Sequence, residues 1–140
     1  MMNIEFSFIV IDDSELDCFV AKKIIERTNK ALITKTFHNA QRALEAIRRN
    51  QKDYGKPGTI ILLDIQMPMM NGFNFIEEFE KLPDEIKKNY MIIIVTILSS
   101  KRNPNEIYRI LSHGTVNNII EKPLTKEKLF SSLMKLRSAV

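Results

Sequence analysis

Five short apolar runs, separated by longer amphipathic stretches, constrain the fold of this 140-residue chain more than any other feature. The first, third and fourth runs are nearly continuous in Ile, Leu and Val, as expected for strands that helices cover on both faces. They should be the central strands. The alternation predicts strand and helix units around a parallel sheet. The runs span residues 6–11, 32–37, 59–63, 91–98 and 116–120.

Apolar residues at helical spacing predict a helix after each strand. Ser14 is a candidate N-cap for the first helix, and Pro104 suits the first turn of the fourth. Parallel strands need crossover connections, so we expect an α/β fold, a five-stranded parallel sheet doubly wound with five helices. The residues that mark the helices are Leu16, Phe19, Val20 and Ile24; Ala40, Ala43, Leu44 and Ile47; Phe73, Ile76 and Phe79; Ile107, Ile110 and Leu111; and Leu129, Leu133 and Leu136.

Composition narrows the class of protein. With 44% hydrophobic and 27% charged residues, we expect residues 1–140 to form a single globular domain with no output domain. The chain has no apolar run of membrane-spanning length and no secretion signal, so we expect a cytoplasmic protein without a membrane partner. Its net charge of +4 is spread without a dense basic stripe, so we expect no direct nucleic-acid binding. The single cysteine, Cys18, is expected to pack in the core.

Polar residues that follow the apolar runs are the candidates for a site, because ligands of such sheets bind beyond the carboxyl ends of the strands. These residues are Asp12 and Asp13, Asp64, Thr96 and Lys122. Three converging carboxylates repel unless a cation neutralises them, and Mg²⁺ prefers oxygen ligands. The Lys122 ammonium and the Thr96 hydroxyl suit a phosphoryl group carried on one carboxylate.

Each of these residues also has an ordinary structural interpretation. The Asp12-Asp13 pair could cap a helix, Thr96 could be a strand residue, and Lys122 could be a solvated loop lysine. The combination favours a site. His38 and His113 fall outside it and are expected to be structural or surface residues.

This set resembles the receiver domains of response regulators, which carry an acidic pair, a phosphoaccepting Asp, a Ser or Thr and a Lys-Pro step in this order. The resemblance covers essentially the whole chain, and it implies a flavodoxin-like fold with strand order 2-1-3-4-5. The segments that carry it are IVIDD at 9–13, LLDIQMPMMNG at 62–72, VT at 95–96 and EKPL at 121–124.

The resemblance implies a role for each site residue. Asp64 would be the nucleophile that takes a phosphoryl group, and Mg²⁺ would bind the side chains of Asp13 and Asp64 and the backbone carbonyl of Gln66. Asp12 would act largely through metal-bound water. Lys122 would pair with Asp64 and then with the phosphoryl oxygens.

Among the residues expected to govern switching, Thr96 follows the family pattern and two other positions depart from it. Thr96 would move to donate a hydrogen bond to the new phosphoryl group, as in the family. The usual switch aromatic, three residues before the lysine, is replaced by Ile119. The residue after Thr96, usually small, is Ile97, and Leu98 beyond it is expected to shield the phosphoryl group from water.

The resemblance implies a two-component response regulator that switches protein interactions. Its phosphoryl donor would be a histidine kinase or a histidine phosphotransfer protein, its target another protein, and its form a monomer or a phosphorylation-dependent dimer. One alternative is a small Mg²⁺-dependent phosphatase with Asp64 as nucleophile, which Gln66 disfavours because such enzymes often carry an acid there. A second alternative is a receiver-like scaffold that is never phosphorylated.

Overall fold

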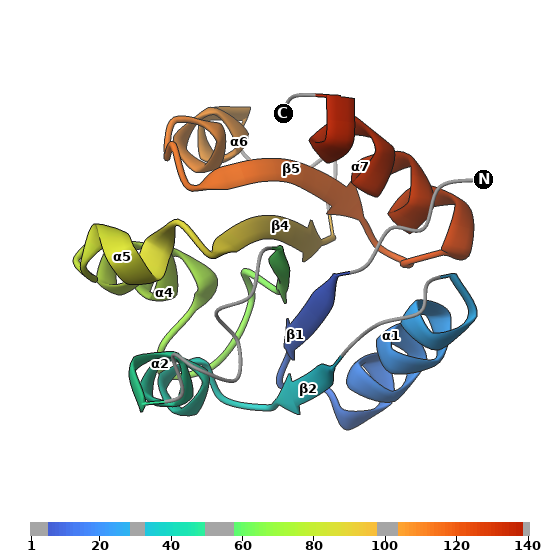
Figure 1. Cartoon of the computed structure of the whole chain (residues 1–140), viewed down its shortest axis with the longest axis horizontal. Coiled ribbons are helices and arrows are strands. Elements are labelled where there is room, and N and C mark those ends of the chain that lie inside the picture. The colour runs from blue at the N-terminus through green and yellow to red at the C-terminus, as the bar shows by residue number, and fades with distance from the viewer. Residues whose placement is uncertain (1–5, 29–32, 50–57, 98–103, 139–140) are drawn as a thin grey trace.

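The computed structural model describes residues 6–28, 33–49, 58–97 and 104–138 (Figure 1). Five strands form one parallel sheet in the order β2-β1-β3-β4-β5, which confirms the expected topology. The expected strand limits at residues 32 and 98 lie outside the described residues. The strands are β1 (Ser7–Ile11), β2 (Thr34–Phe37), β3 (Thr59–Leu63), β4 (Tyr90–Thr96) and β5 (Val116–Glu121).

The described part of the chain contains six helices, one more than expected. The additional helix is α5, a single turn after Pro83 in which Ile86 is the buried residue. A four-residue helix is too short to produce a hydrophobic period, which is why the sequence pattern missed it. The helices are α1 (Glu15–Thr28), α2 (Ala40–Arg49), α4 (Gly72–Glu80), α5 (Asp84–Lys87), α6 (Pro104–Leu111) and α7 (Lys126–Ser138).

Helices cover the sheet on both faces, as the continuous apolar strands predicted (Figure 1). On one face α2, α4, α5 and α6 pack against alternate strand residues such as Ile9 and Ile61. On the other face α1 and α7 pack against the intervening strand residues, such as Phe8 and Ile60, whose side chains point the opposite way. Strands β1, β3 and β4 are therefore central, and their ends are held between two helical layers.

Helix α1 lies with an unexpected face toward the core. Leu16, Phe19 and Val20, which marked the helix in the sequence, are 69%, 58% and 40% exposed. Small side chains at the buried positions allow the helix to approach the sheet, and the expected burial of Cys18 is confirmed. The core side of α1 consists of the buried Cys18, Ala21 and Ile25, and the predicted Ile24 packs partly buried against the same cluster.

Local capping explains where the helices near the strand ends begin. The Ser14 hydroxyl accepts a hydrogen bond from the Asp17 backbone N–H at 3.1 Å, so the predicted N-cap is confirmed. Asn71 and Asn74 form a reciprocal capping box that starts α4.

No helix among the described residues is long and apolar enough to span a bilayer.

Candidate functional site

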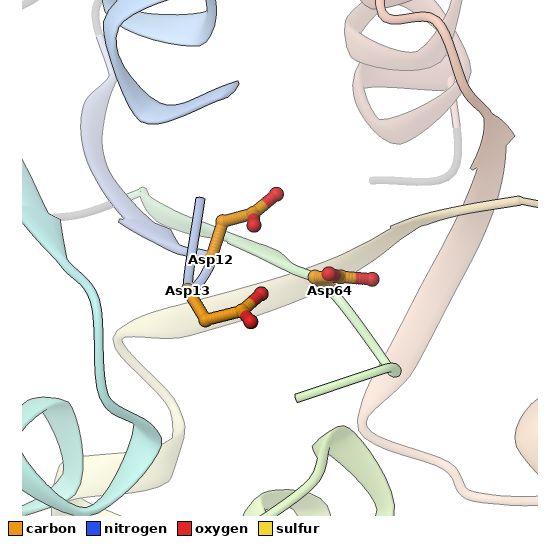
Figure 2. Close-up of side chains that lie close together, drawn as sticks. All are labelled: Asp12, Asp13 and Asp64. Atoms are coloured by element: carbon orange, nitrogen blue, oxygen red, sulfur yellow. The ribbon is translucent and has the colours of Figure 1, made fainter. Parts of the chain in front are cut away.

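Asp12, Asp13 and Asp64 meet at the carboxyl edge of the sheet (Figure 2). Strands β1 and β3 are neighbours with Ile11 opposite Leu63, so the residues that follow each strand are brought together. The Asp64 backbone N–H donates to the Ile11 carbonyl at 3.0 Å and holds this alignment. One oxygen from each of the three carboxylates lies within 4.8 Å of the others.

This cluster fits a hard divalent cation. Its ligand atoms are carboxylate oxygens, and Asp13 is exposed while Asp12 and Asp64 are buried, so the site is open to solvent on one side. Burial raises the pKa of Asp64; the Lys122 charge lowers it, and the Asp12 charge raises it further. The net direction is upward, so ionised Asp64 is costly here and a bound cation would relieve that cost.

Lys122 supplies the positive charge of the site. Its Nζ donates to Asp12 Oδ2 at 2.9 Å and lies 3.5 Å from Asp64 Oδ2. Burial alone would lower the pKa of Lys122, but hydrogen bonds to Asp12 and Asp17 and the nearby Asp64 charge outweigh it, so the pKa is raised. The lysine is therefore a permanently charged ammonium at neutral pH.

Asp17 is a contact of the site that the sequence pattern missed. Its Oδ2 accepts from Lys122 Nζ at 3.0 Å, closer than Asp64. In the sequence, an acidic residue in the first turn of a helix is explained by the helix dipole alone. The only sequence signal was its position one helical turn after Asp13, which is not distinctive.

Thr96 and Gln66 lie at the ends of β4 and β3 as expected. Thr96 is fully buried, and its backbone carbonyl accepts from the Lys122 N–H at 2.8 Å, which links the ends of β4 and β5. The Gln66 backbone N–H donates to Asp64 Oδ1 at 3.2 Å and orients that carboxylate. The Gln66 side chain is exposed.

Cys18 and His38 support the main chain next to the acidic pair. The Cys18 thiol donates to the Asp12 carbonyl at 3.3 Å, and His38 Nδ1 lies 3.4 Å from the same oxygen. Burial raises the pKa of Cys18 to about 11, so the thiol stays protonated and unreactive. His113 instead pairs with Glu80 at 2.7 Å.

Of the other residues expected to govern switching, Ile119 is partly buried and Ile97 is exposed. Ile119 is partly buried against the core layer of α2, α4 and α6, beside Ile94 of β4. Ile97 is 54% exposed just beyond Thr96. Leu98, which was expected to shield the phosphoryl group, lies outside the described residues.

The fold and its edge site define a doubly wound α/β domain with a lysine-paired carboxylate cluster. Residues 8–134 match the family model for the response regulator receiver domain. The chain belongs to this family, in agreement with the resemblance seen in its motifs.

Relatives and solved structures agree with this assignment. The chain is 31% identical over 125 residues to a protein-glutamate methylesterase/protein-glutamine glutaminase of Treponema pallidum, covering 88% of this chain and 28% of that protein. It is 23% identical over 133 residues to the probable C4-dicarboxylate response regulator DctR of Bacillus subtilis, covering 95% of this chain and 53% of that protein. A response regulator receiver protein from Dyadobacter fermentans superposes with a TM-score of 0.74 at 28% identity, covering 91% and 97% of the two chains. The chain thus spans about half or less of the length of these two curated relatives.

Proposed function

We propose that this receiver domain accepts a phosphoryl group on Asp64 from a phosphohistidine and switches protein interactions in a two-component pathway. The observation that carries the proposal is the carboxylate cluster with Lys122 ion-paired to both Asp12 and Asp64. Such a site neutralises charge and positions oxygens, which is what phosphoryl transfer chiefly requires.

Mg²⁺ is the proposed cofactor, held by the side chains of Asp13 and Asp64, the Gln66 backbone carbonyl and, through water, Asp12. The bound ion would offset carboxylate repulsion and the charge of the incoming phosphoryl group. The buried Asp64 carboxylate is the nucleophile, and Lys122 pairs with the phosphoryl oxygens once they are attached.

Signal output is proposed to run through the ends of β4 and β5. The Thr96 hydroxyl moves to donate a hydrogen bond to the phosphoryl group, and Thr96 is already linked to Lys122 through the main chain. Ile119 packs against the core near the ends of β4 and β5, so we propose that it responds by a change in its packing, in place of the rotation of an aromatic ring. We also propose that residues 1–140 form one receiver unit, since every described strand belongs to one sheet.

The phosphodonor is proposed to be a protein that docks on α1. Leu16, Phe19 and Val20 expose an apolar face, and Val20 also lines a cavity of about 90 Å³ that reaches Asp64 and Lys122. Exposed apolar patches of this kind mark protein contacts. With autophosphorylated histidine kinases as donors, Phe19→Ala should slow transfer, while uptake from acetyl phosphate stays at the wild-type rate.

We propose that the domain itself is a phosphoacceptor and not an enzyme. Acetyl phosphate and Mg²⁺, followed by intact mass measurement, test the proposal. A stoichiometric adduct that is stable in acid, labile in base and absent from Asp64→Asn supports it. Rapid multiple turnover instead indicates a phosphatase, and the absence of any adduct indicates a scaffold.

A further inference from the structure

Lys122 is shared among three carboxylates, and one of them lies outside the set that the phosphoacceptor function requires. Its Nζ lies 2.9 Å from Asp12 Oδ2, 3.0 Å from Asp17 Oδ2 and 3.5 Å from Asp64 Oδ2. The two shorter contacts are hydrogen bonds. The ammonium therefore lies closer to the carboxylates of Asp12 and Asp17 than to that of the phosphoacceptor.

The backbone of Asp17 is held beside Asp12 by the start of its helix. Its backbone N–H donates to the Ser14 hydroxyl at 3.1 Å, and the Ser14 N–H in turn donates to Asp12 Oδ1 at 2.9 Å. The cap thus ties the Asp17 backbone to the Asp12 side chain. Both carboxylates turn one oxygen toward the same ammonium.

A phosphoryl group on Asp64 would compete for this ammonium. An ammonium has three donors, and those of Lys122 face three carboxylates before any phosphoryl group arrives. The attached group carries roughly −1.5 to −2 charges, in place of the single charge of the free Asp64 carboxylate, and has three acceptor oxygens. The Lys122 side chain is 18% exposed and that of Asp17 is 46% exposed, so Asp17 can return to water at little cost when it loses the lysine.

We propose that Asp17 is a positioning residue that holds Lys122 on the α1 side of the unphosphorylated site, so that a phosphoryl group on Asp64 must break the Lys122–Asp17 ion pair. This inference rests on the phosphoacceptor function proposed above. The pair favours the unphosphorylated state and lowers the affinity of the site for a phosphoryl group. Because Asp17 is half-exposed, the expected effect is modest, roughly two- to fivefold in binding.

Titration with beryllofluoride, a tetrahedral mimic of the phosphoryl group, at saturating Mg²⁺ tests the inference without covalent chemistry. Asp17→Asn should bind the mimic roughly two- to fivefold more tightly than the wild type. Glu15→Gln is the matched control, because Glu15 is an exposed acid in the same helical turn. It removes the same charge without touching Lys122, and it should bind the mimic as the wild type does.

The position of the ammonium provides a second measurement. The ¹³Cε and ¹⁵Nζ resonances of Lys122 should move in ligand-free Asp17→Asn and coincide with those of the wild type once the mimic is bound. Equal affinities for Asp17→Asn and Glu15→Gln, or weaker binding by Asp17→Asn, overturn the inference. If the wild type does not bind beryllofluoride at all, the phosphoacceptor function itself is wrong, and the inference falls with it.

Discussion

Gly72, the first residue of α4, has no room for a side chain, and the atoms it would meet belong to the site. A Cβ built at Gly72 lies 2.7 Å from Ile65 Cα, 2.8 Å from the Asp64 carbonyl oxygen and 2.8 Å from Ile65 Cδ1. Two of these are main-chain atoms directly at the phosphoacceptor. The Gly72 N–H also donates to the Ile65 carbonyl at 3.0 Å, so the helix start cannot simply move away.

Gly72→Ala is therefore expected to destabilise the fold and to displace Asp64. Overpacking of this kind costs about 1–3 kcal/mol of unfolding free energy, which lowers the melting temperature by roughly 3–10 °C in a domain of this size. The contact at 2.8 Å falls about 0.6 Å short of the 3.4 Å at which ordinary contact begins. Since a misplacement of about 1 Å costs roughly a hundredfold in rate, phosphoryl uptake should slow roughly tenfold.

Thermal unfolding followed by circular dichroism and the rate of uptake from acetyl phosphate measure the two effects. Gly114→Ala is the control, because a Cβ there meets nothing within 4 Å and the backbone has no positive φ. That variant should match the wild type in rate and within about 0.5 kcal/mol in stability. If Gly72→Ala behaves like Gly114→Ala in both assays, the close packing of α4 on Asp64 is not what positions the phosphoacceptor.

Three further predictions follow from the site. Asp64→Asn should raise the melting temperature in Mg²⁺-free buffer near neutral pH, because the raised pKa of Asp64 makes its ionised form costly in the folded protein. This gain should fade as the pH drops through the raised pKa toward the unfolded value of 3.8. A gain in melting temperature that persists in acid would contradict the assignment. Asp13→Asn should weaken Mg²⁺ binding roughly ten- to a hundredfold, measured by calorimetry, with the melting temperature of the metal-free protein not lowered. Ile119→Ala should cost about 1–2 kcal/mol of stability, because Ile119 packs against the core, yet the variant should retain the chemical-shift response to beryllofluoride. Loss of that response in the folded variant would show that Ile119 carries the switch.

The presence of a parallel sheet with buried strands was predictable because its cause is local in the sequence. Runs such as residues 59–63 and 91–98 are nearly continuous in apolar residues, which is typical of strands buried on both faces. The same reasoning located the site, since parallel strands place their carboxyl ends at one edge. Asp12 and Asp64 are 52 positions apart in sequence, yet their carboxylates converge there as expected.

The orientation of α1 was not predictable, because its period fits more than one face. Leu16, Phe19 and Val20 are the larger side chains, but the shorter Cys18 and Ala21 face the sheet. The sequence shows how hydrophobic each position is, whereas the distance between α1 and the sheet decides which side chains fit. The short helix α5 was missed for a related reason, since one turn has no period to detect.

The sequence by itself determined the class of fold and the residues offered at the carboxyl ends of the strands, because these follow from hydrophobicity and spacing along the chain. The order of the strands came from the resemblance of its motifs to the receiver family. Only the tertiary structure decided that Lys122, 105 positions after Asp17, bonds to it as closely as to Asp12. That contact depends on where the start of α1 lies relative to the end of β5. The distance between Lys122 and Asp17 cannot be predicted from either residue alone, because it depends on how α1 and the end of β5 pack against the rest of the domain.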